Sequence, residues 1–276
     1  MEAVKEVQFE TNGFKKRLKS MLKVDFRRMF TTPLFYIMVG ISLVVPILIL
    51  VMTTMMSGTT TVNPQAGVET PMTGFDNVWQ IVSSVSGGDG ASAGAGMDMM
   101  AMCNMNLIYF ATAVLVCLFV ADDFRSGYAK NLFTVRAKKT DYVISKTLVC
   151  FVGGAGMILA FFIGSMIGGG VAGISFDLEA VGTTAGGIVA CLVSKILLVS
   201  VFVSIFLIMS VVAKQKLWLS ILLSLGVGMF LFMMIPMMTP LNANAMHVIL
   251  CAAGGALFAV GLGAVSNQIL KKTSLV

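Results

Sequence analysis

Long, uninterrupted runs of apolar residues are the feature that most restricts the fold of this 276-residue chain. Hydrophobic residues make up 57% of it and charged residues only 12%, about half the charged fraction of a typical soluble domain. Roughly 20 helical residues cross a bilayer, and the runs are long enough to do so. They are continuously apolar rather than alternating, which favours helices over a β-barrel. The sequence therefore predicts an all-α integral membrane protein.

Six membrane-spanning helices are predicted from these runs. The last of them has a second interpretation, because Pro236, Pro240 and Asn242 are typical of turns and helix ends. Under that interpretation the region forms two short segments that re-enter the membrane from outside. The predicted spans cover about 34–56, 104–121, 142–168, 186–213, 217–238 and 246–265.

The charged residues are segregated between the two sides of these spans. Apart from Lys195, every Lys and Arg lies in the N-terminal segment, the loop 122–146, the turn between the fourth and fifth spans, or the C-terminal tail. Basic residues near span ends stay in the cytoplasm, so both termini are predicted to be cytoplasmic. The net charge of +6 then reflects sidedness, and no nucleic-acid partner is predicted. The opposite side carries only acids: Glu69, Asp76, Asp89, Asp98, Asp177 and Glu179.

Two segments outside the spans have distinct patterns. Residues 1–33 form a predicted cytoplasmic N-terminus with an amphipathic elbow helix, whose apolar residues recur at helical spacing among basic ones. This helix is expected to lie in the bilayer interface, and contact with a cytoplasmic partner is a second interpretation. Residues 57–103 form the predicted external loop, which is too short for a core of its own and is expected to act as a lid or rim.

Lys195 is the only charge clearly inside a predicted span. Such a charge costs about 2.5–3.5 kcal/mol on insertion scales, so it should face protein or water, or snorkel to the outer headgroups. The alternative to snorkelling is a polar contact that lines a translocation path together with Ser194 and Ser200.

Small residues and methionines mark apolar surfaces within the spans. The 22 methionines favour an adaptable apolar lining, with a copper(I) path as the second interpretation because thioethers bind that soft ion. The cysteines and the single histidine show no metal-ligand spacing, so no metal site is predicted. Small residues at every fourth position let helix backbones approach closely, and packing within the chain is favoured over a dimer interface. They are Ala160, Gly164 and Gly168 in the third span and Gly255, Ala259 and Gly263 in the sixth.

The chain lacks the motifs of common catalytic and nucleotide-binding sites. It has no HExxH pair, no GxSxG elbow and no GxxxxGK[ST] phosphate loop. We therefore predict no catalytic residue, no enzymatic activity in this chain and no cofactor of its own. The loop 122–146 carries six cations without catalytic machinery, so it is most simply a docking surface for another protein.

This loop and the six-span layout resemble the bacterial ATP-binding cassette (ABC) transporter permeases of the type-2 exporter family. In that family an acidic residue ends the second span, and a Gly, a helical segment, a basic turn and a Lys at the third span follow. Asp123, Gly127 and Lys146 match these elements, and the turn is Arg136–Lys139. Tyr128 departs from the small hydroxyl residue that commonly follows the Gly. The resemblance covers nearly the whole chain.

The resemblance implies a permease domain over 34–276 and a separate cytoplasmic ABC ATPase subunit that binds ATP and Mg²⁺. Two copies would pair as a homodimer, or one copy would form a heterodimer with a related permease, in the bacterial inner membrane. The loop 122–141 would hold a coupling helix, around Lys130–Val135, seated in a groove of the ATPase. The implied coupling residues are Asp123, Arg125, Gly127, Lys130, Arg136, Lys138 and Lys139.

The cargo is predicted from the character of the spans. Their apolar, Met- and Phe-rich interior favours an amphipathic or hydrophobic substrate, in first place a toxin-like or antimicrobial peptide. Drugs and lipid-linked molecules are the second choice. A non-transporting membrane scaffold or an immunity protein is the alternative of a different class, and it would not stimulate a partner ATPase in a cargo-dependent way.

Overall fold

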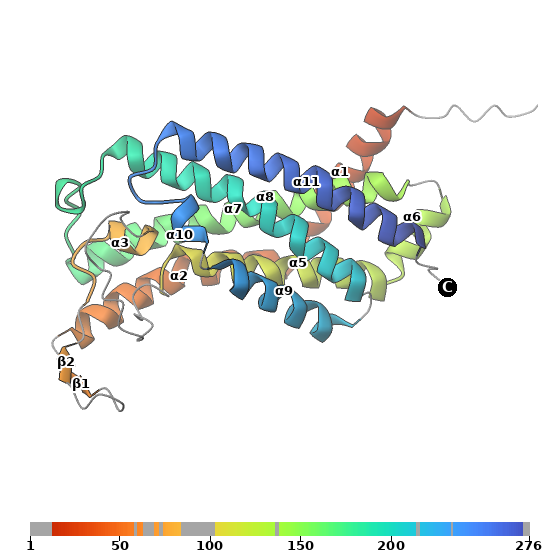
Figure 1. Cartoon of the computed structure of the whole chain (residues 1–276). Coiled ribbons are helices and arrows are strands. Elements are labelled where there is room, and N and C mark those ends of the chain that lie inside the picture. The colour runs from red at the N-terminus through yellow and green to blue at the C-terminus, as the bar shows by residue number, and fades with distance from the viewer. Residues whose placement is uncertain are drawn as a thin grey trace, which may run out of the picture.

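The computed structural model describes residues 13–57, 60–62, 69–71, 74–83, 103–135, 138–213, 216–232 and 234–272. In this part of the chain, long helices lie side by side in one bundle and short elements lie at its two ends (Figure 1). The long helices are α2 (Pro33–Met56), α5 (Ile108–Arg125), α7 (Lys139–Ala172), α8 (Ala185–Ala213) and α11 (Ala245–Lys272).

Five helices of the described residues are long and apolar enough to cross a membrane. They are α2, α7, α8, α11 and α5 with the preceding 3₁₀ turn η1 (Met105–Leu107). The prediction of an all-α membrane fold is confirmed at this level. The predicted bounds of the spans agree with the observed bounds of α2 and α8 to within one residue. Helix α7 begins three residues before its predicted span and continues four residues beyond it.

The fifth predicted span, 217–238, is not one helix. The chain forms α9 (Leu217–Phe232) and then a separate short helix, α10 (Ile235–Met238), with Pro236 in the first turn of α10. Proline is favoured there because its missing N–H would have no helical partner. The 16 residues of α9 rise about 24 Å, less than the roughly 30 Å of a bilayer core. The sixth predicted span is a single helix, α11, and the two-segment interpretation of that region is wrong.

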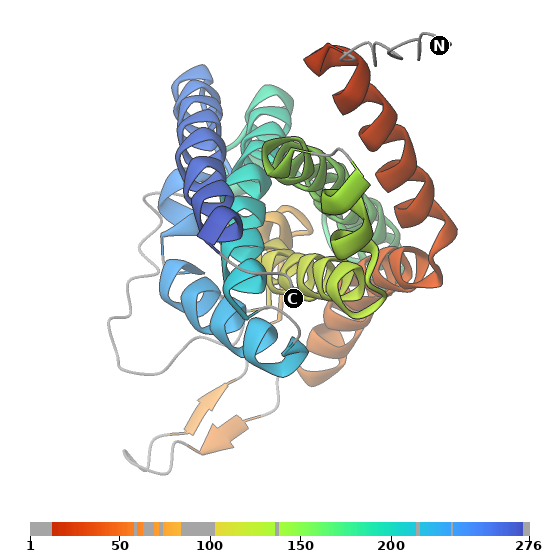
Figure 2. The same cartoon turned by 90° about the vertical axis from the view of Figure 1, so that its right-hand side faces the viewer.

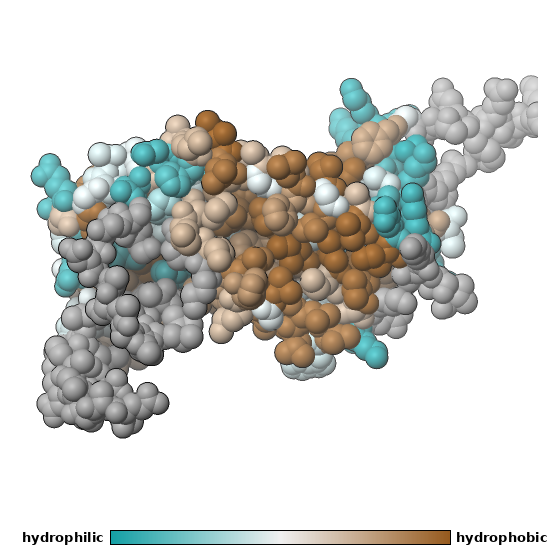
Figure 3. All heavy atoms as spheres, viewed as in Figure 1, coloured by the Kyte–Doolittle hydropathy of each residue, from teal (hydrophilic) through white to brown (hydrophobic). Residues whose placement is uncertain are grey.

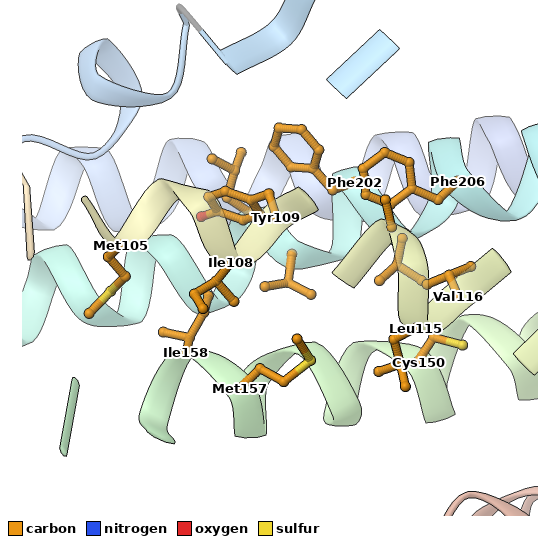
Figure 4. Packing of buried hydrophobic residues seen from close by; sticks show 14 of the residues in the cluster. Met105, Ile108, Tyr109, Leu115, Val116, Cys150, Met157, Ile158, Phe202 and Phe206 are labelled. Atoms are coloured by element: carbon orange, nitrogen blue, oxygen red, sulfur yellow. The ribbon is translucent and has the colours of Figure 1, made fainter. Parts of the chain in front are cut away.

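Helix α5 lies at the centre of the bundle (Figure 2). It contacts α2, α7, α8 and α9, while α2 packs most extensively on α7, and α11 on α8. Figure 4 shows the resulting core, in which Tyr109 of α5 lies beside Phe202 of α8 and Ile108 of α5 lies beside Ile158 of α7. The rings of Tyr109 and Phe202 stack with their centroids 4.5 Å apart.

Glycines of α7 allow its close contact with α2. A Cβ atom at Gly164 would lie 2.1 Å from the backbone oxygen of Leu43, and one at Gly168 would lie 2.8 Å from the Cα of Ile47. Gly255 of α11 likewise faces Ser200 of α8. The predicted small-residue faces of α7 and α11 thus serve packing within the chain at these positions.

On the face seen in Figure 3, an apolar belt covers the middle of the bundle, between hydrophilic ends. Its members include large side chains that are at least 70% exposed, which a lipid bilayer would cover. In the view of Figure 3 the belt runs over α9 and α11. The exposed large side chains of these two helices include Leu222, Phe230, Leu257 and Val260.

The two ends of the bundle carry different short elements. At one, here called the α6 end, lie α1 (Phe14–Thr31) and α6 (Tyr128–Val135). The other, the α3 end, holds α3 (Trp79–Val82), α10, the 3₁₀ turn η2 (Glu179–Val181) and a hairpin in which β1 (Thr60–Val62) pairs antiparallel with β2 (Glu69–Pro71). Helix α1 thus lies where the amphipathic elbow helix was predicted, within 1–33.

Candidate functional site

A buried network of charges lies at the α6 end, where α1, α5 and α7 meet. The ammonium of Lys146 lies 2.9 Å from Asp25 Oδ1 and 2.7 Å from Asp123 Oδ2, and all three side chains are fully buried. Ser145 donates a hydrogen bond of 2.6 Å to the other oxygen of Asp25, and Tyr142 donates one of 2.9 Å to Asp123. Both oxygens of Asp25 and Oδ2 of Asp123 thus have partners, which buried charges require.

Arg28 extends the network to the surface. Its guanidinium lies 2.5 Å from Asp123 Oδ1 and 3.1 Å from Asp122 Oδ2, so one residue of α1 binds two consecutive acids of α5. Burial alone lowers the pKa of Arg28, but the charge and hydrogen bond of Asp123 outweigh it and raise the pKa above the ordinary value. Arg28 is therefore held as a cation at any physiological pH.

Helix α6 is attached to this network by Tyr128. The Arg28 guanidinium lies over the Tyr128 ring, 4.2 Å from its centroid, in cation–π geometry. Burial, followed by the nearby charge of Asp25, raises the pKa of the Tyr128 hydroxyl, so it stays neutral. Tyr128, which departs from the sequence pattern of the type-2 exporter permeases, thus connects α6 to α1.

A sharp turn sets the direction of α6. Gly127 has a φ of +72°, in the left-handed region that only glycine adopts without cost, and its carbonyl accepts the N–H of Asn131 in the first turn of α6. Ala129 is fully buried and Leu132 and Phe133 pack against the core, while Lys130, Asn131 and Thr134 are exposed. The helix predicted around Lys130–Val135 is confirmed, beginning two residues earlier.

The predicted coupling residues fall into distinct environments. Arg125, Lys130 and Lys138 are exposed. Lys139 is half-buried and donates to the carbonyl oxygen of Leu270, near the end of α11. Asp123 is fully buried, so its partners are within the chain and not on a docking surface. Arg136 lies outside the described residues.

Sequence reasoning missed Asp25 and Arg28. The signal was present in α1, where Met21, Asp25 and Met29 repeat every fourth residue and therefore share one face. All three are buried. An acid on the apolar face of a basic amphipathic helix indicates a buried cationic partner rather than a headgroup contact.

A second polar cluster lies toward the α3 end, around Lys195. Its side chain is fully buried, and the ammonium donates to Asn106 Oδ1 at 2.6 Å and to Thr239 Oγ1 at 3.1 Å. The Tyr109 hydroxyl donates to the Lys195 carbonyl at 2.9 Å. The snorkelling interpretation is wrong, because this ammonium ends inside the protein.

The two serines predicted beside Lys195 do not join it in one cluster. Ser200 donates to the carbonyl of Leu197 and packs against Gly255 of α11. Ser194 is fully buried, and its hydroxyl has no hydrogen-bond partner within the described part of the chain. The three residues line one helix without converging on a point.

The part of the 57–103 segment that contains α3 covers the α3 end of the bundle. Val78 is buried against Gly169 of α7, where a Cβ would lie 2.1 Å from it. The Trp79 indole N–H donates to the carbonyl of Phe176 at 3.0 Å, and Ser83 Oγ to that of Thr239 at 2.6 Å. These contacts place α3 over the end of the bundle, and its role as a lid stays a prediction.

No group of three or more His, Cys, Asp or Glu side chains is placed to hold a metal ion in the regions that the structure describes. Comparison with protein-family models, curated proteins and solved structures finds no match for this chain.

Proposed function

We propose that this chain is the permease subunit of an ATP-driven ABC exporter of the type-2 kind, with ATP and Mg²⁺ bound by a separate cytoplasmic ATPase. The chain forms the path for an amphipathic or hydrophobic cargo, in first place a peptide. The α6 end faces the cytoplasm of a bacterial inner membrane, and the α3 end faces outward. A homodimer or a heterodimer with a related permease completes the path.

The single observation that carries the proposal is the attachment of α6. A short amphipathic helix with an exposed polar face stands at the basic end of the bundle, and Tyr128, Arg28 and Asp123 join it to a buried ion-pair network. A partner that pushes on the exposed face of α6 would move α1, α5 and α7 together, because breaking a buried ion pair costs about 3–5 kcal/mol.

The energetics follow from two-state linkage. A partner ATPase shifts the permease between two arrangements only by the difference in its affinity for them. ATP-dependent closure of the ATPases supplies that difference at α6, and the rigid network passes it to the spans. The lack of a phosphate loop in the chain agrees with this division of labour.

The test is charge reversal on α6 and at the start of α7, which follows it. The variant Lys130→Glu/Lys138→Glu changes two exposed cations outside the buried network. We expect it to insert normally and, when it is co-expressed with a candidate ABC ATPase that the unchanged chain recovers, to lose that recovery at least tenfold in a pull-down. The matched control is Lys216→Glu, which reverses a cation in the connection between α8 and α9. This variant should recover as much ATPase as the unchanged chain does. Equal recovery by the double variant would refute docking at α6.

A further inference from the structure

The buried ammonium of Lys195 has an excess of hydrogen-bond donors around it. It can donate three hydrogen bonds, and in the described part of the chain it makes two, to Asn106 Oδ1 and Thr239 Oγ1. An ammonium only donates, so Asn106 must turn its oxygen toward it, and this leaves the Asn106 Nδ2 group buried without a partner. The Thr239 hydroxyl proton is already given to the carbonyl of Ile235.

The charge of Lys195 is likewise uncompensated. All the ion pairs within the described residues lie at the α6 end, and none includes Lys195. A buried cation held only by neutral oxygens is costly, and a carboxylate in their place would supply two acceptors and the missing negative charge. The surplus N–H groups of Asn106 would meet the same carboxylate.

We propose that Lys195 and Asn106 form a binding site for the carboxylate of the cargo. In this structure, Asn106 Oδ1 and Thr239 Oγ1 occupy the positions that the two carboxylate oxygens would take. The inference rests on the proposed permease function and names the chemical class of its cargo. An amphipathic molecule with one free carboxylate, such as a hydrophobic peptide with its C-terminus unblocked, fits the charged cluster and the apolar core around it.

A short segment covers the ammonium. Thr239 belongs to the turn after α10, and Ser83 holds that turn through a hydrogen bond of 2.6 Å to its carbonyl. The chain after this turn, with Gly187 and Ala190 of α8, lines a pocket of about 450 Å³ at the α3 end. Gly187 lies eight residues before Lys195, about 12 Å along α8. The segment that caps the ammonium through Thr239 is thus followed within a few residues by the chain that lines this pocket.

The experiment uses a matched pair of probes on the purified full chain in lipid nanodiscs. The probes are the tripeptide acetyl-Leu-Phe-Leu with a free C-terminal carboxylate and the same peptide with a C-terminal amide. Because hydrogen bonds to charged groups contribute about 1.5–3 kcal/mol, we expect the acid to bind with a Kd about tenfold or more below that of the amide. Lys195→Arg should keep this preference and Lys195→Met should lose it.

Two further variants keep the test decisive. Asn106→Asp places a carboxylate beside the ammonium, so it should abolish the preference for the acid while raising the unfolding temperature. Ser204→Ala removes a buried hydroxyl from the same helix, one that donates to the carbonyl of Ser200, and should retain the preference. Equal binding of the two peptides to the unchanged chain, absence of acid binding, or a preference that persists in Asn106→Asp would each overturn the proposal. No ATPase is present, so this result is independent of the α6 pull-down.

Discussion

Replacing Lys146 with Met should destabilise the chain more than any other single loss of a cation at the α6 end. The ammonium serves two fully buried carboxylates, at 2.9 Å from Asp25 and 2.7 Å from Asp123. Asp123 would keep Arg28, but Asp25 would keep only the hydroxyl of Ser145. Removing one partner of a buried ion pair costs about 3–5 kcal/mol, and we expect a loss of that size.

The reasoning predicts a rescue as well as a loss. Asp25→Asn removes the orphaned charge, so the double variant Asp25→Asn/Lys146→Met should recover about 1–3 kcal/mol relative to Lys146→Met alone. Arg125→Gln is the control, because it removes an exposed cation from the same end and should change the stability by less than about 0.5 kcal/mol.

Equilibrium unfolding in mixed micelles, followed by the fluorescence of Trp79 and Trp218, measures these differences. A Lys146→Met variant within about 1 kcal/mol of Arg125→Gln would contradict the assigned network, since a buried pair must cost more than an exposed charge. Additive losses in the double variant would contradict it too, because they would mean that Asp25 and Lys146 do not interact.

Two glycines give further predictions, both measured by the same unfolding assay. Gly164→Val should lower the free energy of unfolding by at least about 2 kcal/mol, because its Cβ would lie 2.1 Å from the backbone oxygen of Leu43 and α2 would have to move. The control is Gly170→Ala, because a Cβ at Gly170 would have nothing within 4 Å. Equal losses of stability in the two variants would refute the close packing of α7 on α2. Gly127→Ala should cost about 1–2 kcal/mol at a φ of +72°, whereas Gly127→Asn should cost less; if Ala is tolerated as well as Asn, the turn does not depend on the left-handed conformation.

The helices could be predicted from the sequence because their apolar runs are local signals. The same runs failed at the fifth span, where Pro236 begins a new helix in a segment that is apolar throughout. Hydropathy alone does not register such a break.

The partners of the buried charges could not be predicted, because they come from distant parts of the chain. Asp25 and Lys146 are 121 residues apart, and Asn106 and Lys195 are 89 apart. The charge pattern of the sequence predicts that Asp123 and Lys146 belong to the cytoplasmic loop 122–146. Only the packing of α1 against α7 shows that they are buried, and packing depends on which helix faces meet.

Helix α5 connects the two polar clusters, and this gives the proposed function a physical route. Asp123 lies near one end of α5, in the network joined to α6, whereas Asn106 lies in the turn η1 that precedes its other end and binds Lys195. The 18 residues of α5 rise about 27 Å between these anchors. A helix packed on four neighbours moves as a unit, so a displacement at the α6 end would also strain the short hydrogen bond between Asn106 and Lys195. The carboxylate site would then change its affinity for cargo with the state of α6, which is the linkage that an ATP-driven exporter requires.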